Sequence, residues 1–196
     1  MLQQLDLDVL YFFNVTLSSS LLDVVMPFLT NSRNWIPVYG LAAIFLVWKH
    51  KWRGVRVVIA VAVMVGAANL ITNVFIKELI ARPRPCATDA LGTQLIPWIR
   101  LPDGMRYGFS MPSSHAVNNF ATAMFFIVIL PKRKEIIWSL FGIALIVGIT
   151  RIYLGLHYPS DTLAGMLFGL GIGYLFAIGD RVLEKKYFPN NESLLG

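Results

Sequence analysis

The stretch VVIAVAVMVGAANLITNVFI, from Val57 to Ile76, contains twenty residues and no charged side chain. At about 1.5 Å per residue, a helix of this length crosses the roughly 30 Å hydrocarbon core of a bilayer. A second uncharged run, Thr162–Gly179, contains Gly165, Gly169 and Gly173. Small residues at every fourth position let a neighbouring helix approach closely. These two stretches predict an integral membrane protein whose helices pack as a bundle.

The composition of the whole chain agrees with this interpretation. Of its 196 residues, 56% are hydrophobic and 14% are charged, with a mean hydropathy of +0.63, whereas soluble domains carry about 25% charged residues. The net charge of +6 is better explained by basic loops at a membrane surface than by nucleic-acid binding. The single cysteine, Cys86, excludes an internal disulfide. The N-terminal MLQQLDLD has two acids and no basic residue, so a cleavable signal peptide is not expected.

Three shorter apolar runs complete the predicted bundle. We predict five spanning helices, at residues 34–50, 55–79, 114–131, 135–156 and 160–182. For residues 1–33 we predict two short helices lying in the membrane interface, with a sixth span as the alternative, because Val9–Leu22 is uncharged but rich in hydroxyl side chains and Pro27 follows it. The expected fold is therefore one all-α membrane domain over residues 1–196, an integral membrane helical bundle of five to six spans. Residues 34–182 form its core, and 183–196 form a cytoplasmic tail.

The lysines and arginines indicate how this bundle is oriented. With five spans, ten of them fall on one side, namely Lys49, Lys51, Arg53, Arg56, Lys132, Arg133, Lys134, Arg181, Lys185 and Lys186. The other seven are Arg33, Lys77, Arg82, Arg84, Arg100, Arg106 and Arg151. Because basic residues concentrate in cytoplasmic loops, the ten-charge side is predicted to be cytoplasmic. The other side then faces the periplasm or the cell exterior, across the inner (plasma) membrane.

Polar residues concentrate in three stretches on that outer side. They are KELIARPRP (Lys77–Pro85), PSSH (Pro112–His115) and TRIYLGLHYPSD (Thr150–Asp161). Ionisable residues at membrane depth are expensive, so they indicate a functional site. Arg82, Arg100 and Arg106 lie on the same side, and a substrate head group, solvent or a lipid phosphate would each explain them.

The residue types in the three stretches favour phosphate chemistry. Lys77, Arg84 and Arg151 supply positive charge, and arginine binds phosphoryl oxygens in a bidentate fork. Ser113 and Ser114 precede a predicted helix, where hydroxyls and free N–H groups favour an anion. Such cations would repel a divalent metal, so neither a metal nor another cofactor is expected.

The two histidines of these stretches can divide the chemistry between them. One of His115 and His157 can attack phosphorus while the other protonates the leaving oxygen. Asp161 follows His157 by four residues, close enough to fix the tautomer of its imidazole.

The three stretches, in this order and spacing, resemble the signature motifs of the type 2 phosphatidic acid phosphatase superfamily, which also includes soluble vanadium haloperoxidases. The resemblance implies that His157 is the nucleophile of a phosphohistidine mechanism, that Asp161 orients it and that His115 is the general acid. It further implies that the phosphate is held by Lys77, Arg84, Ser113, Arg151 and the backbone N–H of Ser114. This chain departs from the family pattern at Ser114, where glycine is usual, and at Thr150, where serine is common.

A site at the outer boundary implies a lipid substrate with its phosphate in the outer leaflet. From the resemblance, undecaprenyl diphosphate, converted to undecaprenyl phosphate for cell-wall synthesis, is the first expectation. Phosphatidylglycerophosphate, phosphatidic acid and lipid A 1-phosphate are alternatives. Functions of another class are transport and non-catalytic lipid binding, but a transporter would place its charges near the midplane between repeated halves. The oligomeric state is left open.

Overall fold

The computed structural model describes residues 2–130 and 134–187, and this part of the chain is built from helices joined by loops, with no strand. One isolated bridge pairs Thr88 with Gln94 in the long loop between α5 and α6. The predicted all-α class is therefore confirmed. The predicted basic residues Lys132 and Arg133, and residues 188–196 of the predicted tail, lie outside the described residues.

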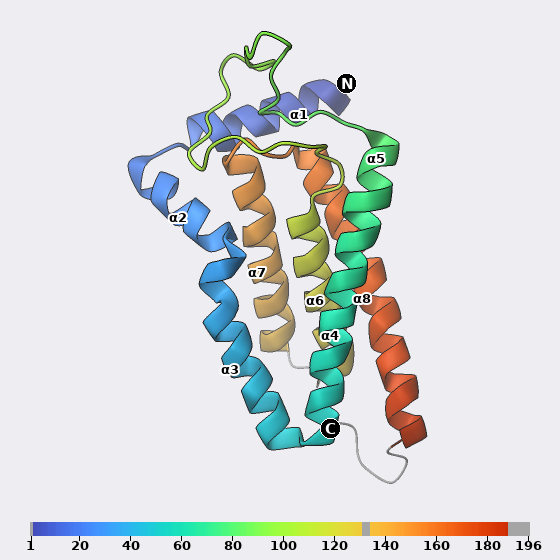
Figure 1. Cartoon of the computed structure of the whole chain (residues 1–196). Coiled ribbons are helices and arrows are strands. Elements are labelled where there is room, and N and C mark those ends of the chain that lie inside the picture. Colours follow the sequence, from blue (N-terminus) through green and yellow to red (C-terminus); the bar gives the residue numbers. More distant parts are fainter. Residues whose placement is uncertain (1, 131–133, 188–196) are drawn as a thin grey trace.

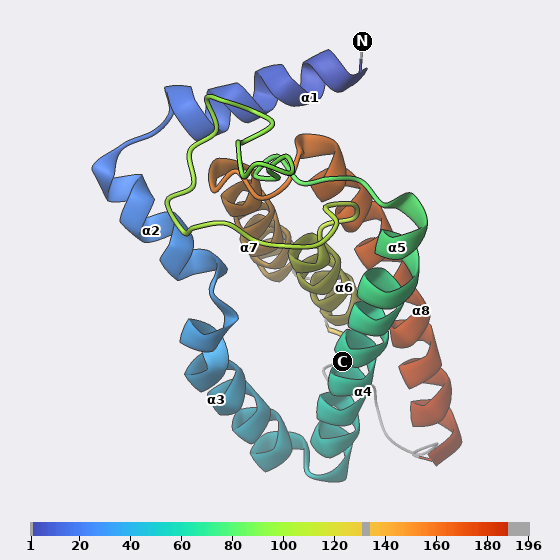
Figure 2. The same cartoon turned by 45° about the horizontal axis from the view of Figure 1, so that its top comes forward.

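Five helical segments run between the two ends of the molecule, and the first of them packs against the second while diverging from the other three (Figures 1 and 2). They are α3 (Ser32–His50), α4 (Trp52–Leu70) with its continuation, α6 (Ser114–Ile129), α7 (Lys134–Tyr153) and α8 (Pro159–Tyr187). The continuation of α4 is a π-helical turn, η2 (Ile71–Ile76), followed by α5 (Lys77–Ile80). Each predicted span thus coincides with a helix.

Not every helix of the bundle is long and apolar enough to qualify as a membrane span. Within the described residues, three helices are long and apolar enough to cross a membrane: Trp52–Ile80, Lys134–Tyr153 and Pro159–Tyr187. Ser114–Ile129 is apolar but shorter, with 16 residues, or about 24 Å at the usual helical rise. The structure therefore supports a multi-pass membrane protein without confirming a count of five or six.

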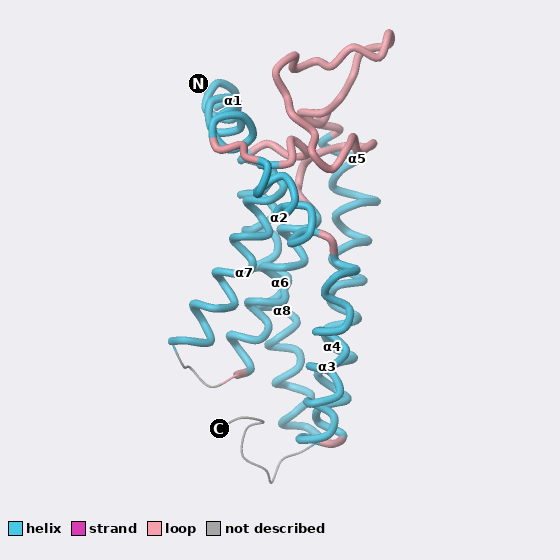
Figure 3. The backbone as a smooth tube through the Cα atoms, turned by 90° about the vertical axis from the view of Figure 1, so that its left-hand side faces the viewer, coloured by secondary structure: helices cyan, strands magenta, loops and turns pink. Residues whose placement is uncertain are grey.

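The N-terminal residues form two short helical segments, as predicted. The first comprises α1 (Leu2–Tyr11) and the π-helix η1 (Phe12–Thr16), and the second is α2 (Ser20–Thr30). The Ser19 side chain accepts a hydrogen bond from the N–H of Leu22, which caps α2 at its start. The two segments are bent by 115° relative to each other. As a result α1 lies across one end of the bundle (Figures 1 and 3).

The glycine series of α8 packs against α6, as predicted. A Cβ added at Gly165 would lie 2.7 Å from the Ser113 carbonyl oxygen, and one at Gly169 would lie 2.5 Å from that of Val117. Gly173 meets the backbone of α6 in the same way at Ala121. Only glycine allows this approach, which places the start of α6 beside the start of α8. The second and third polar stretches are thereby brought together.

The long loop at residues 81–113 closes the same end of the bundle as α1, as Figure 2 shows with that end turned forward. Ala81 ends α5 in the left-handed region, with φ of 49°, and so turns the chain across the bundle. The connection between α3 and α4 and the last turns of α8 lie at the opposite end (Figure 1). There, Arg56 forms ion pairs with Asp180 at 2.9 Å and with Glu184 at 3.4 Å.

Candidate active site

The eight predicted site residues all belong to elements that meet at the end covered by α1. Lys77 opens α5, and Arg84 follows in the loop. Ser113 is the N-cap of α6, followed by Ser114 and His115 in its first turn. Arg151 lies in the last turn of α7, His157 in the α7–α8 connection and Asp161 in the first turn of α8.

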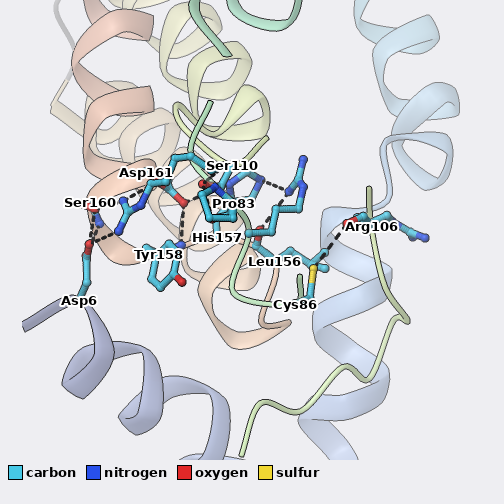
Figure 4. A network of polar contacts seen from close by, with 12 residues as sticks. Asp6, Pro83, Cys86, Arg106, Ser110, Leu156, His157, Tyr158, Ser160 and Asp161 are labelled. Atoms are coloured by element: carbon cyan, nitrogen blue, oxygen red, sulfur yellow. Dashed lines mark hydrogen bonds and ion pairs between the residues drawn. The ribbon is translucent and has the colours of Figure 1, made fainter. Parts of the chain in front are cut away.

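His157 is buried and in direct contact with Arg84. Arg84 Nη1 lies 3.0 Å from His157 Nε2 and also donates to the Leu156 carbonyl at 3.0 Å (Figure 4). A guanidinium has no acceptor, so Nε2 must accept here, which places the imidazole proton on Nδ1. Burial, followed by the charges of Arg84, Arg151 and Lys77, lowers the pKa of His157 well below its usual value. The ring is therefore neutral near pH 7, with a lone pair on Nε2.

Asp161 lies on the other side of the imidazole and is held at both oxygens. Its Oδ1 accepts from Arg82 Nη1 at 2.8 Å, and its Oδ2 accepts from the backbone N–H of Tyr158 at 2.8 Å. Oδ2 is 3.6 Å from His157 Nδ1, an ion-pair distance that is too long for a hydrogen bond. The predicted pair is thus brought together, and it would tighten by a shift of less than 1 Å; such contacts commonly shorten when substrate binds.

Three cations near His157 lack a carboxylate partner. In the part of the chain that the structure describes, no ion pair involves Lys77, Arg84 or Arg151. Lys77 is 9% exposed and Arg151 is 5% exposed. The positive charges of all three cations disfavour protonation of His157 and so lower its pKa. Arg151 Nη1 donates to the Thr30 hydroxyl at 3.1 Å, while its Nε has no partner among the described residues. Buried cations without counterions favour an anionic ligand.

The start of α6 adds further groups to this positive site. Ser113 is buried, and its hydroxyl has no partner within residues 2–130 and 134–187. Its side chain also does not cap α6, so the first N–H groups of the helix stay available to an anion. The His115 side chain lies within electrostatic range of His157, Arg151, Lys77 and Arg84.

The departure at Ser114 has a local explanation. Ser114 is the first residue of α6, so its backbone is helical and needs none of the conformational freedom of glycine. Its hydroxyl donates to Asn73 Oδ1 at 2.7 Å, which ties α6 to the π-helical turn η2. We therefore expect that serine at this position does not strain the backbone.

Arg82, Arg100 and Arg106 each pair with an aspartate of the chain, which the sequence did not indicate, and the Arg106 side chain also remains exposed. Arg82 binds Asp161 at 2.8 Å and Asp6 at 2.7 Å. Arg100 binds Asp23 at 2.6 Å, and Arg106 binds Asp103 at 2.9 Å. The RPRP sequence around Arg84 could have drawn attention to Arg82, but no sequence signal marked Asp6 as its partner.

Comparisons with known proteins show the family to which this chain is related. The model of the PAP2 superfamily matches residues 55–181. The lipid A 4'-phosphatase of Bacteroides thetaiotaomicron is 33% identical over 177 residues, which cover 89% of this chain and 76% of that protein. Undecaprenyl-diphosphatase BcrC of Bacillus subtilis is 31% identical over 158 residues, which cover 81% of this chain and 75% of that protein.

The fold is also similar to two solved structures. A transmembrane PAP2 type phosphatidylglycerolphosphate phosphatase from Bacillus subtilis superposes with a TM-score of 0.70 and 26% identity, over 95% of this chain and 89% of that one. LpxE of Aquifex aeolicus superposes with a TM-score of 0.68, over 88% of this chain and 94% of that one. At 23% identity, this likeness concerns the fold alone.

Proposed function

This chain belongs to the PAP2 superfamily and is a membrane lipid phosphatase, and we propose that it removes a phosphate group from its lipid through a phosphohistidine on His157, without a metal. The observation that carries the proposal is the set of three cations near His157, namely Lys77, Arg84 and Arg151, none of which forms an ion pair within the described residues. A phosphate group supplies the negative charge that these cations lack.

The proposed reaction has two steps. Phosphate binding draws the Arg84 guanidinium from Nε2 to the phosphoryl oxygens, which frees the lone pair. Nε2 then attacks phosphorus, the bond from phosphorus to the leaving oxygen breaks, and His115 gives that oxygen its proton. In the second step His115 takes a proton from water, the resulting hydroxide attacks phosphorus, and the phosphorus–nitrogen bond breaks to release inorganic phosphate.

The remaining residues of the site stabilise the charges of this reaction. Asp161 faces Nδ1 at 3.6 Å and stabilises the imidazole as it acquires positive charge. Lys77, Arg151 and the start of α6, at Ser113 and Ser114, bind the equatorial oxygens of phosphorus, where negative charge is spread.

Our first candidate substrate is undecaprenyl diphosphate. It is supported by similarity to BcrC and to an undecaprenyl-diphosphatase of Sulfolobus acidocaldarius, which is 30% identical over 145 residues. A second candidate is a lipid A 4'-phosphate, favoured by the relative from Bacteroides thetaiotaomicron at 33% identity. Phosphatidylglycerophosphate, phosphatidic acid and lipid A 1-phosphate complete the panel.

We place the protein in the inner (plasma) membrane with its site facing the periplasm or cell exterior. The basic residues around the α3–α4 connection and in the last turns of α8, such as Lys51 and Lys185, lie at the end opposite the site (Figure 1). Cytoplasmic loops concentrate lysine and arginine, which supports this orientation.

The test is phosphate release by detergent-purified protein, with EDTA present, on each lipid of the panel. His157→Ala is compared with His50→Ala, a histidine at the far end of α3. We expect turnover that survives EDTA, persists in His50→Ala and disappears in His157→Ala. Loss of turnover with EDTA would refute the metal-free step, and activity of His157→Ala would refute the nucleophile. A folded wild-type protein inactive on every lipid would favour lipid binding or transport.

A further inference from the structure

Asp6 of α1 is buried, 7% exposed, and lies beside the residues that hold Asp161. Its Oδ2 accepts from Arg82 Nη2 at 2.7 Å and from the Ser160 hydroxyl at 2.5 Å. Its Oδ1 accepts from the backbone N–H of Ser160 at 2.8 Å. Figure 4 shows this group next to Asp161 and His157.

Two of these contacts converge on the first turn of α8. The N–H groups of a first helical turn lack partners within the helix, and the Asp6 carboxylate satisfies that of Ser160. Asp161, the next residue, accepts the N–H of Tyr158 in the manner of a capping box. The position of the Asp161 carboxylate therefore depends on how this turn is held.

The third contact acts through Arg82, which bridges the two carboxylates. Nη1 of Arg82 donates to Asp161 Oδ1 at 2.8 Å and to the Ser160 hydroxyl at 2.6 Å, while Nη2 donates to Asp6. The guanidinium also stacks on the Tyr158 ring, 4.0 Å from its centroid. Without Asp6, Asp161 would be the one carboxylate paired with Arg82 among the described residues, and the two could shift together toward the cavity that borders Asp6, Arg82 and Ser160.

Anchoring of the N-terminal segment does not require Asp6. Leu10 is fully buried, and the fully buried Asn14 side chain donates to the carbonyls of Tyr153 and Arg100 and accepts from the N–H of Arg100. These contacts hold α1 and η1 against the bundle in addition to those of Asp6. We therefore expect the helix to stay in place when Asp6 is changed.

We propose that Asp6 is a positioning residue, which acts through Arg82 and Ser160 to hold the Asp161 carboxylate against His157. The N-terminal helix is then a part of the catalytic apparatus. This inference rests on the proposed function, because it assigns Asp6 to the Asp161–His157 pair.

The test uses the full-length protein and three variants of α1. Asp6→Asn removes the charge but keeps the size, and Asp6→Glu keeps the carboxylate. A cavity of about 770 Å³ bordered by Asp6, Arg82 and Ser160 gives the extra methylene room. Asp8→Asn is the matched control, since Asp8 is an exposed aspartate of the same helix. The readouts are kcat and KM for phosphate release and the melting temperature.

We expect Asp6→Asn to lower kcat on the order of 10- to 100-fold, by analogy with the loss caused by removing a residue that orients a metal ligand. KM should stay close to wild type, and the melting temperature should fall by no more than about 12 °C, the limit for one buried donor left without an acceptor. Asp6→Glu should recover most of kcat, and Asp8→Asn should match wild type. In an Arg82→Gln background, measured by single turnover, Asp6→Asn should lower the rate by a smaller factor than in the wild type, since the two changes share the contact through Arg82 and only the contacts with Ser160 remain to be lost.

Wild-type kcat in Asp6→Asn would overturn the inference, and so would a joint fall of melting temperature and activity that Asp6→Glu does not reverse. Full additivity with Arg82→Gln would equally exclude action through Arg82. These outcomes all leave the proposed function intact. An inactive wild type together with an inactive Asp8→Asn would instead refute the function itself.

Discussion

Replacing Asp161 by asparagine tests how far the reaction depends on the carboxylate behind His157. Asp161 receives two donors, Arg82 Nη1 and the N–H of Tyr158, each at 2.8 Å, and it faces His157 Nδ1 at 3.6 Å. Asparagine has one acceptor oxygen and a donor NH₂ group. In either rotamer, its NH₂ must therefore face one of the two donors in a buried place.

The magnitudes follow from this geometry. One buried donor left without an acceptor costs about 1–3 kcal/mol, and at about 2–4 °C per kcal/mol for a chain of this size the melting temperature falls by about 2–12 °C. The larger effect concerns the imidazole. Once phosphate has drawn Arg84 away from Nε2, and with no carboxylate facing Nδ1, the tautomer with its proton on Nε2 becomes competitive, and that tautomer has no lone pair for phosphorus. In a serine protease triad, the equivalent change lowers kcat about 10⁴-fold, and we expect a loss of about 10³- to 10⁴-fold.

The assay is single-turnover phosphate release with excess enzyme, beside a melting curve in the same detergent. Asp8→Asn, which changes an exposed aspartate of α1 that accepts from Gln4 on the same helix, is the control. An Asp161→Asn protein with kcat within tenfold of wild type would refute the role of the carboxylate. A melting temperature lowered by much more than 12 °C would mean that the kinetic loss reports unfolding.

Three further predictions concern the neutral imidazole, the glycine contact and the far ion pair. Because burial and nearby cations lower the pKa of His157, its imidazole should remain neutral at pH 6 in ¹⁵N NMR of histidine-labelled protein; a protonated ring at that pH would contradict this. Gly169→Ala should lower the free energy of unfolding by about 1–3 kcal/mol, because the added methyl group overpacks against α6. Gly171→Ala should not, because the space around Gly171 is open. Equal melting temperatures of the two variants would show that α6 and α8 can move apart to make room for the methyl group. Arg56→Ala should lower the melting temperature by leaving the buried Asp180 carboxylate without this partner, yet kcat should be unchanged because the pair lies at the opposite end from the site.

The sequence predicted the parts of the fold and site that depend on local patterns. Uncharged runs near Val57–Ile76 and Thr162–Gly179 located helices, since hydropathy and length act within one segment. The spacing of Gly165, Gly169 and Gly173 predicted a packing face for the same reason. The three polar stretches could be assigned to one side because helices alternate in direction.

The contacts that could not be predicted join residues far apart in the chain. Asp6 and Ser160 are separated by 154 positions, and no periodicity relates α1 to the first turn of α8. Arg82 was left with several interpretations because its partners come from two distant segments. Thr30 likewise reaches Arg151 only because α2 bends back onto α7. Such pairs depend on tertiary packing, which a single sequence does not encode in any local pattern.

The uncompensated cations lead to a prediction for ligand binding in the absence of turnover. Lys77, Arg84 and Arg151 repel one another, and an anion that binds them relieves this repulsion only in the folded state. A ligand at 100 times its dissociation constant stabilises the fold by about 2.7 kcal/mol, which for a chain of this size raises the melting temperature by about 5–11 °C.

Orthovanadate or inorganic phosphate is the natural probe for this effect, with chloride at equal ionic strength as the control for screening. Arg84→Ala should abolish most of the shift, because Arg84 joins the anion site to His157 Nε2 at 3.0 Å. Lys185→Ala should keep the shift, since Lys185 lies in the last turn of α8, at the opposite end from the site (Figure 1). A shift of equal size in both variants would mean that the anion binds elsewhere on this basic chain, and the three buried cations would then need another explanation than phosphate recognition.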